Sequence, residues 1–414
     1  MVTLVACTRG GVSTLAPTPT PPPAATASPD ELGPPQPEAA RIEEHIRFFT
    51  QEIGPRLAGS TQEQEAIEYA REQFERWGYV VEVQTFTATA PSPLLAEVSF
   101  TVEVPEQRKL PAAALEGSST SRIDGPLVDA GTGREEEFGP ETAGAVVLIQ
   151  RKDVPFTEMA RRAQEAGALG VVIANREAGL FPGQLETKAT LPVIAIDRAG
   201  GEALRELLAE GSVEVSVRIR EEVIAHNVIA RPEDGECRTL SGGHYDTVPW
   251  TVGANDNASG AALVLELARA AAAAGLTDHC FALFGAEEQD LQGSVFFVSG
   301  MSAEELGALT AYFNYDVVAG DDRPVVIGDS GLQARAKTLA DQAGLDVGRG
   351  ALSAGAGSDH VSFIEADIPA LMLTMPDFQL LHTPQDTLVN LNPASLEIIS
   401  SLGFALIQSA VVEP

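Results

Sequence analysis

Acidic and histidine side chains recur at three places in the second half of the chain, each close to a short apolar run. The first run ends in His244 and Asp246, a glycine-rich loop then delivers Asp256, and a second run stops at Glu287 and Glu288. Imidazole nitrogen and carboxylate oxygen are ligands that zinc takes in proteins. Because the carboxyl ends of strands border the binding crevice of an open α/β sheet, this spacing predicts a metal site there.

Two more candidate ligands follow apolar runs nearer the C-terminus. Asp316 ends one predicted strand, and His382 lies in the loop after another. A pair of zinc ions roughly 3.5–4 Å apart requires a shared carboxylate together with private ligands for each ion. The chemistry and number of five residues suit such a pair: His244, Asp256, Glu288, Asp316 and His382. Glu287 is then left beside the metals, where a general base is required.

Strands that alternate with helices are expected to position these residues. Strands are predicted over 238–243, 310–316 and 368–375, and helices over 261–274 and 333–343. Such alternation favours an α/β fold with a mostly parallel sheet and helices on both faces. A carboxylate that ends a strand is also a common helix cap or turn residue, and Asp316 alone would be interpreted in that way.

The N-terminal half adds two helices and a strand before the pattern changes. An apolar stripe predicts a helix that breaks at Gly54-Pro55, and Ser60 with Glu63 predicts a capping box for a second helix. Alternation over 79–86 predicts a strand. Residues 108–222 then hold short apolar runs and one helix without a cluster of acids and histidines. We therefore expect one discontinuous domain, residues 39–107 and 223–414, with a smaller α/β domain at 108–222 inserted into it.

Residues 1–38 are expected to lie outside the folded domains. Leu4-Val5-Ala6-Cys7 resembles a bacterial lipobox, in which the cysteine becomes the lipidated first residue, and the Pro/Thr/Ala tract at 16–37 is typical of an extended spacer. Met1 to Thr3 supply no basic segment and almost no apolar one. Either the true start lies upstream or the match at Cys7 is chance. The expectation is an extracytoplasmic protein, lipid-anchored at the cell surface or secreted.

The composition limits the partners. Lys and Arg number 27 against 59 Asp and Glu, a formal net charge of −32, which argues against nucleic acid and anionic membrane surfaces. After the first few residues, no stretch is long and apolar enough to predict a membrane span.

Several motifs together resemble a known family. The chain is similar to the co-catalytic di-zinc aminopeptidases of the bacterial leucyl aminopeptidase and aminopeptidase Y type. The matching motifs stand in the family's order: Gly243 to Asp246 (GHYD), Gly253 to Gly260 (GANDNASG), Phe284 to Glu288 (FGAEE), Gly293-Ser294, Asn314 to Asp316 (NYD), Ser358 to His360 (SDH) and His382 to Thr387 (HTPQDT). The inserted stretch 108–222 resembles a protease-associated domain, and a generic α/β insertion with the same apolar runs stays open. In either case we expect the insertion to shape access to the active site.

The resemblance implies a role for each matched residue. Asp256 resembles the bridging carboxylate, with His244 and Asp316 on one zinc and Glu288 and His382 on the other. Glu287 is implied as the general base and Asp246 as the partner that orients the His244 imidazole. The family also implies a cis peptide between Asp256 and Asn257, a supporting role for His360, and hydrolysis of peptides at a free N-terminus with two zinc ions as cofactors.

Three alternatives remain beside this interpretation. A dipeptidase or carboxypeptidase would use the same metals, with Arg323 or Arg349 as conceivable anchors for a substrate carboxylate, and a non-catalytic receptor would have lost a ligand.

Leu381 stands where some members carry a tyrosine, so another donor or zinc alone must stabilise the oxyanion. If the strands that begin near Cys237 and Cys280 are neighbours, the two thiols form either a disulfide or two separate buried thiols.

Overall fold

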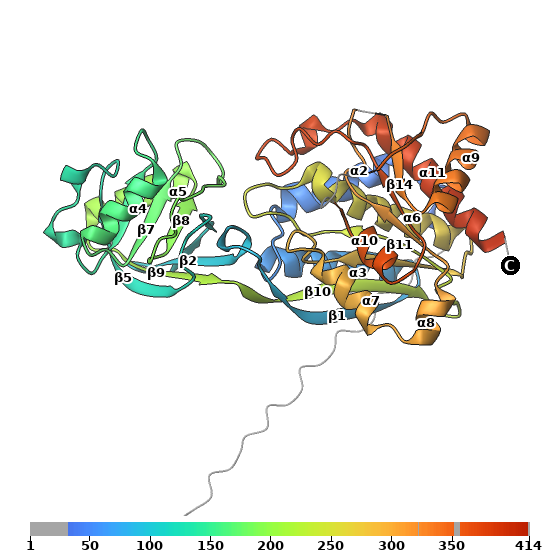
Figure 1. Ribbon diagram of the computed structural model, residues 1–414, viewed down its shortest axis with the longest axis horizontal. Helices are drawn as coiled ribbons and strands as arrows, with labels where there is room; N and C mark the ends of the chain where they lie inside the picture. Colours follow the sequence, from blue (N-terminus) through green and yellow to red (C-terminus); the bar gives the residue numbers. More distant parts are fainter. Residues whose placement is uncertain (1–31, 322, 352–356, 413–414) are drawn as a thin grey trace, which may run out of the picture.

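The computed structural model describes residues 32–321, 323–351 and 357–412, arranged as two lobes that each contain an eight-stranded sheet (Figure 1). The lipobox-like Cys7 and most of the predicted spacer lie outside the described residues. Within the described part of the chain, none of the helices combines the length and apolarity that a membrane crossing requires.

The sheet of the larger lobe confirms the predicted α/β class. Its strand order is β1 (Tyr79–Thr89), β10 (Glu222–Pro232), β12 (His279–Phe284), β11 (Thr239–His244), β13 (Ala311–Tyr315), β16 (Ala370–Thr374), β14 (Val325–Gly328) and β15 (Gly348–Arg349). The four central strands β12, β11, β13 and β16 are parallel to one another, whereas β1, β10 and β14 join in antiparallel pairs. The mostly parallel centre therefore brings the carboxyl ends of several strands to one edge.

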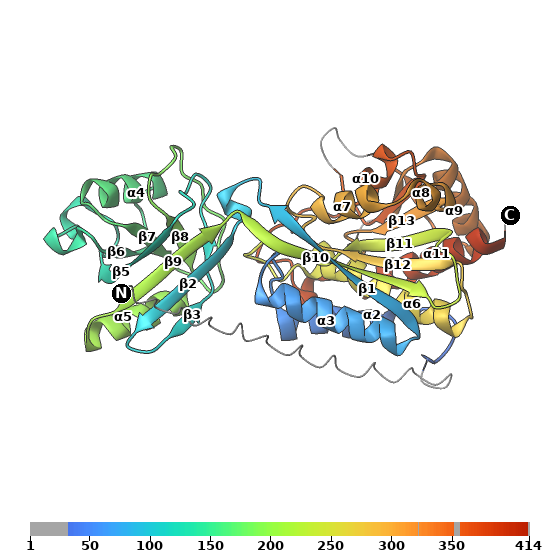
Figure 2. The same cartoon turned by 90° about the horizontal axis from the view of Figure 1, so that it is seen from below.

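Alternate side chains of the central strands enter two different cores, because successive residues of a strand point to opposite faces. On β12, Phe281 belongs to the core formed with helices α2 (Ala39–Arg47), α3 (Thr61–Arg76), α6 (Gly260–Ala273), α9 (Ser330–Ala343) and α11 (Pro393–Val412). Its neighbours Ala282 and Phe284 belong to the core formed with α7 (Gln292–Gly300), α8 (Ala303–Ala308) and α10 (His360–Glu365). Both faces of the sheet are thus covered (Figure 2).

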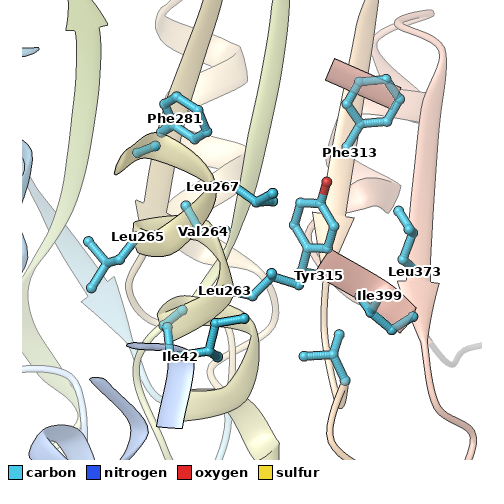
Figure 3. Close-up of a cluster of buried hydrophobic side chains, with 14 of the residues drawn as sticks. Ile42, Leu263, Val264, Leu265, Leu267, Phe281, Phe313, Tyr315, Leu373 and Ile399 are labelled. Carbon is cyan, nitrogen blue, oxygen red and sulfur yellow. The ribbon is translucent and has the colours of Figure 1, made fainter. Parts of the chain in front are cut away.

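Helix α6 is the centre of the first of these cores. Residues 260–271 of this helix are all buried, as expected for a helix that is apolar nearly all round. Figure 3 shows Leu263 and Leu267 of α6 among Phe313, Tyr315 and Leu373 of the sheet. Because its N-terminus follows the Asp256 loop directly, this buried helix fixes the place at which that loop ends.

The sheet of the smaller lobe has the order β3 (Arg108–Leu110), β2 (Glu97–Val104), β9 (Glu214–Arg220), β5 (Arg122–Asp129), β6 (Val146–Gln150), β7 (Gly170–Ala174), β8 (Val193–Ile196) and β4 (Ala113–Ala114). Helices α4 (Phe156–Glu165) and α5 (Arg198–Glu210) contribute to cores on its two faces. Strand β2 pairs with β9, although the sequence pattern placed residues up to 107 in the larger domain. We therefore propose that the smaller domain begins near residue 96 and ends near residue 221.

Two long strands connect the lobes. Strands β1 and β10 pair antiparallel from Tyr79 with Pro232 to Thr89 with Glu222, and this ribbon extends from the larger sheet toward the smaller lobe (Figure 2).

A disulfide joins Cys237 and Cys280, whose Cα atoms are 5.2 Å apart. The structure thus contains the bonded form of the two cysteine arrangements that the sequence left open.

The predicted capping box is only half correct. The Ser60 side chain accepts a hydrogen bond from the Glu63 N–H, as predicted. The Glu63 carboxylate, however, accepts from the Gly59 N–H, and it also accepts from the Tyr245 hydroxyl and the His226 N–H. Buried contacts across the larger lobe therefore draw this side chain away from the box geometry.

Candidate metal centre

Parallel strands bring most of the candidate ligands to one edge of the larger sheet. His244 is the last residue of β11 and lies level with Phe284, the last residue of β12. Glu287 and Glu288 follow β12 within a few residues, and Asp316 follows β13 directly. Adjacent parallel strands that end together therefore place these side chains side by side.

A tight loop ahead of α6 delivers Asp256. The peptide bond between Asp256 and Asn257 is cis, which confirms the prediction made from the family resemblance. Gly253 has φ +54, and a Cβ there would lie 2.1 Å from the Asp256 carbonyl oxygen, so the turn requires glycine. The Asn257 amide donates to the Tyr315 carbonyl 3.0 Å away and fixes the loop against β13.

The Asp256 carboxylate lies between the two imidazoles of the site. Its Oδ1 is 3.3 Å from Nε2 of His244, and its Oδ2 is 3.1 Å from Nε2 of His382. Nε2 of His382 is also 2.9 Å from Oε2 of Glu288, and Nε2 of His244 is 3.5 Å from Oδ1 of Asp316. Oε2 of Glu287 is 3.8 Å from Nε2 of His244. The structure thus brings all six residues into one cluster.

Two groups of possible ligand atoms can be separated by distance. Atoms of His244, Glu287 and Asp316 all lie within 4.8 Å of one another, as do atoms of Asp256, Glu288 and His382. Glu287, predicted as a base, is thus also close enough to be a ligand. Asp256 nevertheless approaches the His244 imidazole more closely than Glu287 does.

The donor atoms of both groups fit zinc. Each group offers one imidazole nitrogen and two carboxylates, which is a typical zinc donor set. Oε1 of Glu288 and Oδ1 of Asp316 are buried without a hydrogen-bond partner. Leaving such an atom unpaired costs about 1–3 kcal/mol, and more for a charged group, so these oxygens favour a cationic partner. A divalent cation in each group would pair these oxygens.

The pKa values show an excess of buried negative charge. Burial, together with the nearby Asp256 carboxylate, raises the pKa of Glu288 to about 7. Burial also raises the pKa of Glu287 well above its usual range, against the opposing effect of His244. For His382, burial lowers the pKa, but hydrogen bonds with Asp256 and Glu288 outweigh burial and raise it to about 11. The surrounding acids thus favour added positive charge.

Asp246 supports both sides of the site. Its carboxylate accepts hydrogen bonds from the N–H groups of Glu287 and Glu288, at 3.1 and 3.2 Å. Its Oδ1 also lies 3.5 Å from Nδ1 of His244. Sequence reasoning assigned Asp246 only to the imidazole, and the hydrogen bonds to the acidic pair are an additional contribution.

Two buried side chains beneath the site carried no role in the sequence analysis. The Asp386 carboxylate accepts from the N–H groups of Asn255 and Asp256, at 2.7 and 3.0 Å. The fully buried Arg56 guanidinium donates to five backbone carbonyls, those of Phe49, Gly54, Tyr245, Val252 and Gly253. Burial lowers the pKa of Arg56 to about 10, and four acids of the site partly offset this effect. An arginine directly after the Gly54-Pro55 break was the only sequence signal for it.

The other candidate histidines lie apart from the ligand groups. His360 is buried, and burial lowers its pKa to about 4, but it belongs to neither group of ligand atoms among the described residues. His279 lies at the amino end of β12, away from the site, and its ring nitrogens contact the hydroxyls of Thr239 and Ser241. His45 contacts the Tyr69 hydroxyl.

Leu381 stands where some family members carry a tyrosine, and none of this chain's tyrosines takes over that role. The chain has five tyrosines, all among the described residues. Their hydroxyls contact His45, Ala268, Glu63, Asn314 and Ser241, respectively, in chain order. Each hydroxyl is therefore occupied outside the ligand groups.

Comparison with known proteins agrees with this site. Residues 227–407 match the model of peptidase family M28, and residues 123–204 match that of the PA domain. Aminopeptidase YwaD of Bacillus subtilis (strain 168) is 28% identical over 391 residues, which cover 88% of this chain and 83% of that protein. The probable lipoprotein aminopeptidase LpqL of Mycobacterium tuberculosis is 29% identical over 282 residues, or 64% of this chain and 55% of that protein.

Solved structures show the same fold. The zinc aminopeptidase BSAP from Bacillus subtilis superposes with a TM-score of 0.59 and 27% identity, over 90% of this chain and 95% of that chain. The aminopeptidase from Aneurinibacillus sp. strain AM-1 gives a TM-score of 0.56 and 29% identity, over 92% and 97% of the two chains. Fold and site define the class of this protein as a metalloexopeptidase. Within that class, the larger lobe matches peptidase family M28 and the smaller lobe matches the PA domain, in agreement with the resemblance recognised from the motifs.

Proposed function

We propose that the protein is a zinc-dependent aminopeptidase that releases residues from the free N-terminus of peptides. The observation that carries this proposal is the Asp256 carboxylate, which places one oxygen beside His244 and the other beside His382. Relatives named as aminopeptidases and a structural neighbour described as a zinc aminopeptidase support it.

In this proposal the site holds two zinc ions. His244 and Asp316 would hold one ion, Glu288 and His382 would hold the other, and Asp256 would be shared between them. The short distances from His382 to Glu288 and Asp256 support the second group. For the first group, the preference for Asp256 over Glu287 rests on its closer approach to His244.

Glu287 is then available for proton transfer. When bound, the two cations polarise the scissile carbonyl and increase the acidity of a water between them. The Glu287 carboxylate accepts a proton from the attacking water and returns it to the leaving amine. The hydrogen bond from its own N–H to Asp246 holds the backbone of this residue at the site during both transfers.

The main test compares peptides with free and blocked N-termini. We expect zinc-loaded protein to cleave free peptides one residue at a time, to lose this activity with a chelator, and to regain it with zinc. Measured metal content should be two zinc ions per chain. Equal cleavage of N-acetylated peptides would contradict an aminopeptidase while leaving a metallohydrolase in place.

A carboxypeptidase on the same site requires a cation for the substrate's terminal carboxylate. Arg323 already pairs with the Asp346 carboxylate, and Arg349 lies on β15, the edge strand of the larger sheet. Neither position favours that alternative. Release of the C-terminal residue from the same peptides would identify it directly, and zinc binding without cleavage would identify a receptor.

We also propose an extracytoplasmic location with a lipid anchor at Cys7. The disulfide between Cys237 and Cys280 is typical of oxidising compartments, and LpqL is described as a probable lipoprotein. Expressed from its complete gene in a bacterial host, the protein should fractionate with membranes, and Cys7→Ala should release it. Equal membrane association of the variant would contradict the anchor.

A further inference from the structure

The two lobes meet beside the metal centre in a small apolar cluster. Its buried members are Ala113, Leu180, Val248 and Trp250, and Leu94 and Leu95 pack against them. Val248 and Trp250 come from the loop that runs between His244 and Asp256, whereas Ala113 and Leu180 belong to the smaller lobe. We call this set the junction cluster. It brings side chains of the smaller lobe against a loop that is flanked by two candidate ligands.

Trp250 connects the junction cluster to a third candidate ligand. Its indole is 7% exposed, and its Nε1 donates to the His382 carbonyl oxygen 2.8 Å away. His382 has φ +52, in the left-handed region, and its side chain is 46% exposed. A partly exposed loop residue in this conformation needs contacts from outside its own loop to keep one position. The buried indole N–H supplies such a contact.

Gln289 connects the lobes on the other side of the centre. Its side chain is fully buried directly after Glu288, and its Nε2 donates to the Leu95 carbonyl 2.8 Å away. Leu95 ends the short 3-10 helix η2 (Pro93–Leu95) in the segment that leads from β1 to the smaller lobe. The amide of Gln292 adds two hydrogen bonds with the backbone of Thr89, at 2.7 and 2.8 Å.

We propose that the smaller lobe holds the zinc-binding geometry through Trp250 and Gln289, which act as positioning residues for His382 and Glu288. The inference rests on the zinc site of the proposed function. Both target ligands belong to the same group, so loosening the junction should weaken the zinc ion held by Asp256, Glu288 and His382. The smaller lobe therefore contributes to metal retention as well as to access.

The test uses two variants and a matched control in the full chain. Trp250→Phe removes the indole donor and keeps a ring in the cluster, and Leu180→Ala changes only the contact from the smaller lobe. Leu185→Ala is the control, because Leu185 is a leucine of the same lobe with similar burial, 5% against 9%. Its cluster contains residues of the smaller lobe alone. Thermal unfolding of all three variants establishes that each is folded.

We expect about a 10-fold faster transfer of one zinc ion to a chelator in both test variants, and less than about a 2-fold change in the control. Turnover should fall by a similar factor with a nearly constant KM, because the two changed side chains are buried in the junction cluster. Zinc retention equal to that of Leu185→Ala in both test variants would overturn the inference.

Fluorescence supplies a signal that does not depend on activity. The chain has two tryptophans, Trp77 and Trp250, and Trp77 packs in the core of the larger lobe with Phe74. In a Trp77→Phe background, zinc loading should change the emission of Trp250, and Leu180→Ala should reduce that change. Emission that does not respond to zinc would count against the coupling.

The outcomes separate this inference from the proposed function. A wild-type protein that hydrolyses peptides but shows no effect of either junction variant on zinc release contradicts the inference alone. A wild-type protein that cleaves no peptide, but whose zinc release accelerates in Trp250→Phe and Leu180→Ala, contradicts the proposed function and supports the inference.

Discussion

At the scale of single residues, the candidate metal centre has an excess of negative charge. Asp256 and Asp316 are buried and Glu287 and Glu288 are partly buried around two imidazoles, and oxygens of two of these acids have no hydrogen-bond partner. Carboxylates do not stay ionised in such surroundings unless cations balance them. The same residues that bind metal would therefore destabilise the apo protein, and zinc should raise its unfolding temperature by mass action.

The first prediction concerns Glu287. Glu287→Gln keeps the size and the backbone N–H that binds Asp246, but it removes the proton acceptor. We expect kcat to fall by about 10²–10⁴-fold with zinc content unchanged. Steady-state kinetics with metal analysis measures both, and the exposed Glu233→Gln is the control. Loss of one zinc ion in Glu287→Gln would instead assign Glu287 as a ligand.

The residues that the fold brings together at the candidate metal centre could be predicted from sequence, because each follows an apolar run and belongs to a short motif. Arg56 and Asp386 were given no role, since their partners are backbone groups that only the folded chain brings to them. Three of the five carbonyls that accept from Arg56 belong to a segment about 190 residues further along the chain. No local pattern encodes such a contact.

The second prediction follows from the position of Arg56. Arg56→Met should lower the free energy of unfolding by on the order of 3 kcal/mol, because five carbonyls lose a charged donor in a buried place. Urea unfolding of the zinc-free protein measures this, so that metal loss does not contribute. The exposed Arg198→Met should change the value by less than about 1 kcal/mol. A similar small change in Arg56→Met would contradict the structural role.

At the scale of elements, the parallel strands β12, β11 and β13 determine where the ligands meet. Their existence was predictable from apolar runs that end in acids, and so was the helix α6 that follows Asp256. The start of the smaller lobe was not predictable, because β2 alternates like any strand and only its pairing with β9 assigns it to that sheet. Likewise, Ser60 and Glu63 fit a capping box in sequence, but in the folded chain the Glu63 carboxylate accepts hydrogen bonds from the Gly59 N–H and the Tyr245 hydroxyl instead.

The third prediction concerns the amino end of β12. Burial lowers the pKa of His279 to about 3, so the native state keeps this ring neutral while the unfolded chain binds a proton below about pH 6.5. The unfolded state then holds more protons, and stability falls as pH drops from about 6.5 toward 3. At pH 5, the neutral His279 should therefore lower the free energy of unfolding by about 2 kcal/mol.

Urea unfolding at pH 7 and pH 5 tests this expectation in wild type and His279→Gln. The glutamine amide cannot gain a proton in this range, so the difference between the two pH values should be smaller in the variant by about 2 kcal/mol. An equal difference in both proteins would show that folding does not lower the pKa of His279.

At the scale of the whole molecule, the charge of −32 surrounds a site that must admit a peptide ammonium group. A strongly negative protein attracts cationic substrates over long distances, and salt screens this attraction. Fold class and net charge both follow from sequence. The contact between the lobes does not, because Leu180 and Trp250 carry no motif and meet only in the folded chain.

The fourth prediction is an ionic-strength effect on selectivity. Peptides with the same N-terminal residue and Lys at the second position should have a higher kcat/KM than those with Glu there. The ratio should shrink several-fold between about 0.01 M and about 1 M salt, as the screening length falls from about 30 Å to about 3 Å. A peptide with an uncharged second residue is the control. A ratio that does not vary with salt would place the selectivity in local contacts.

The ribbon of β1 and β10 leaves the larger sheet and returns to it at register partners, Thr89 and Glu222. A gene that lacked the intervening codons would need only a tight hairpin turn to close the remaining chain. The smaller lobe could thus have been acquired in one insertion without rerouting any older strand. In a chain shortened in this way, the Trp250 indole would lose its contacts with Ala113 and Leu180, so the smaller lobe covers a side chain that the larger lobe alone would expose.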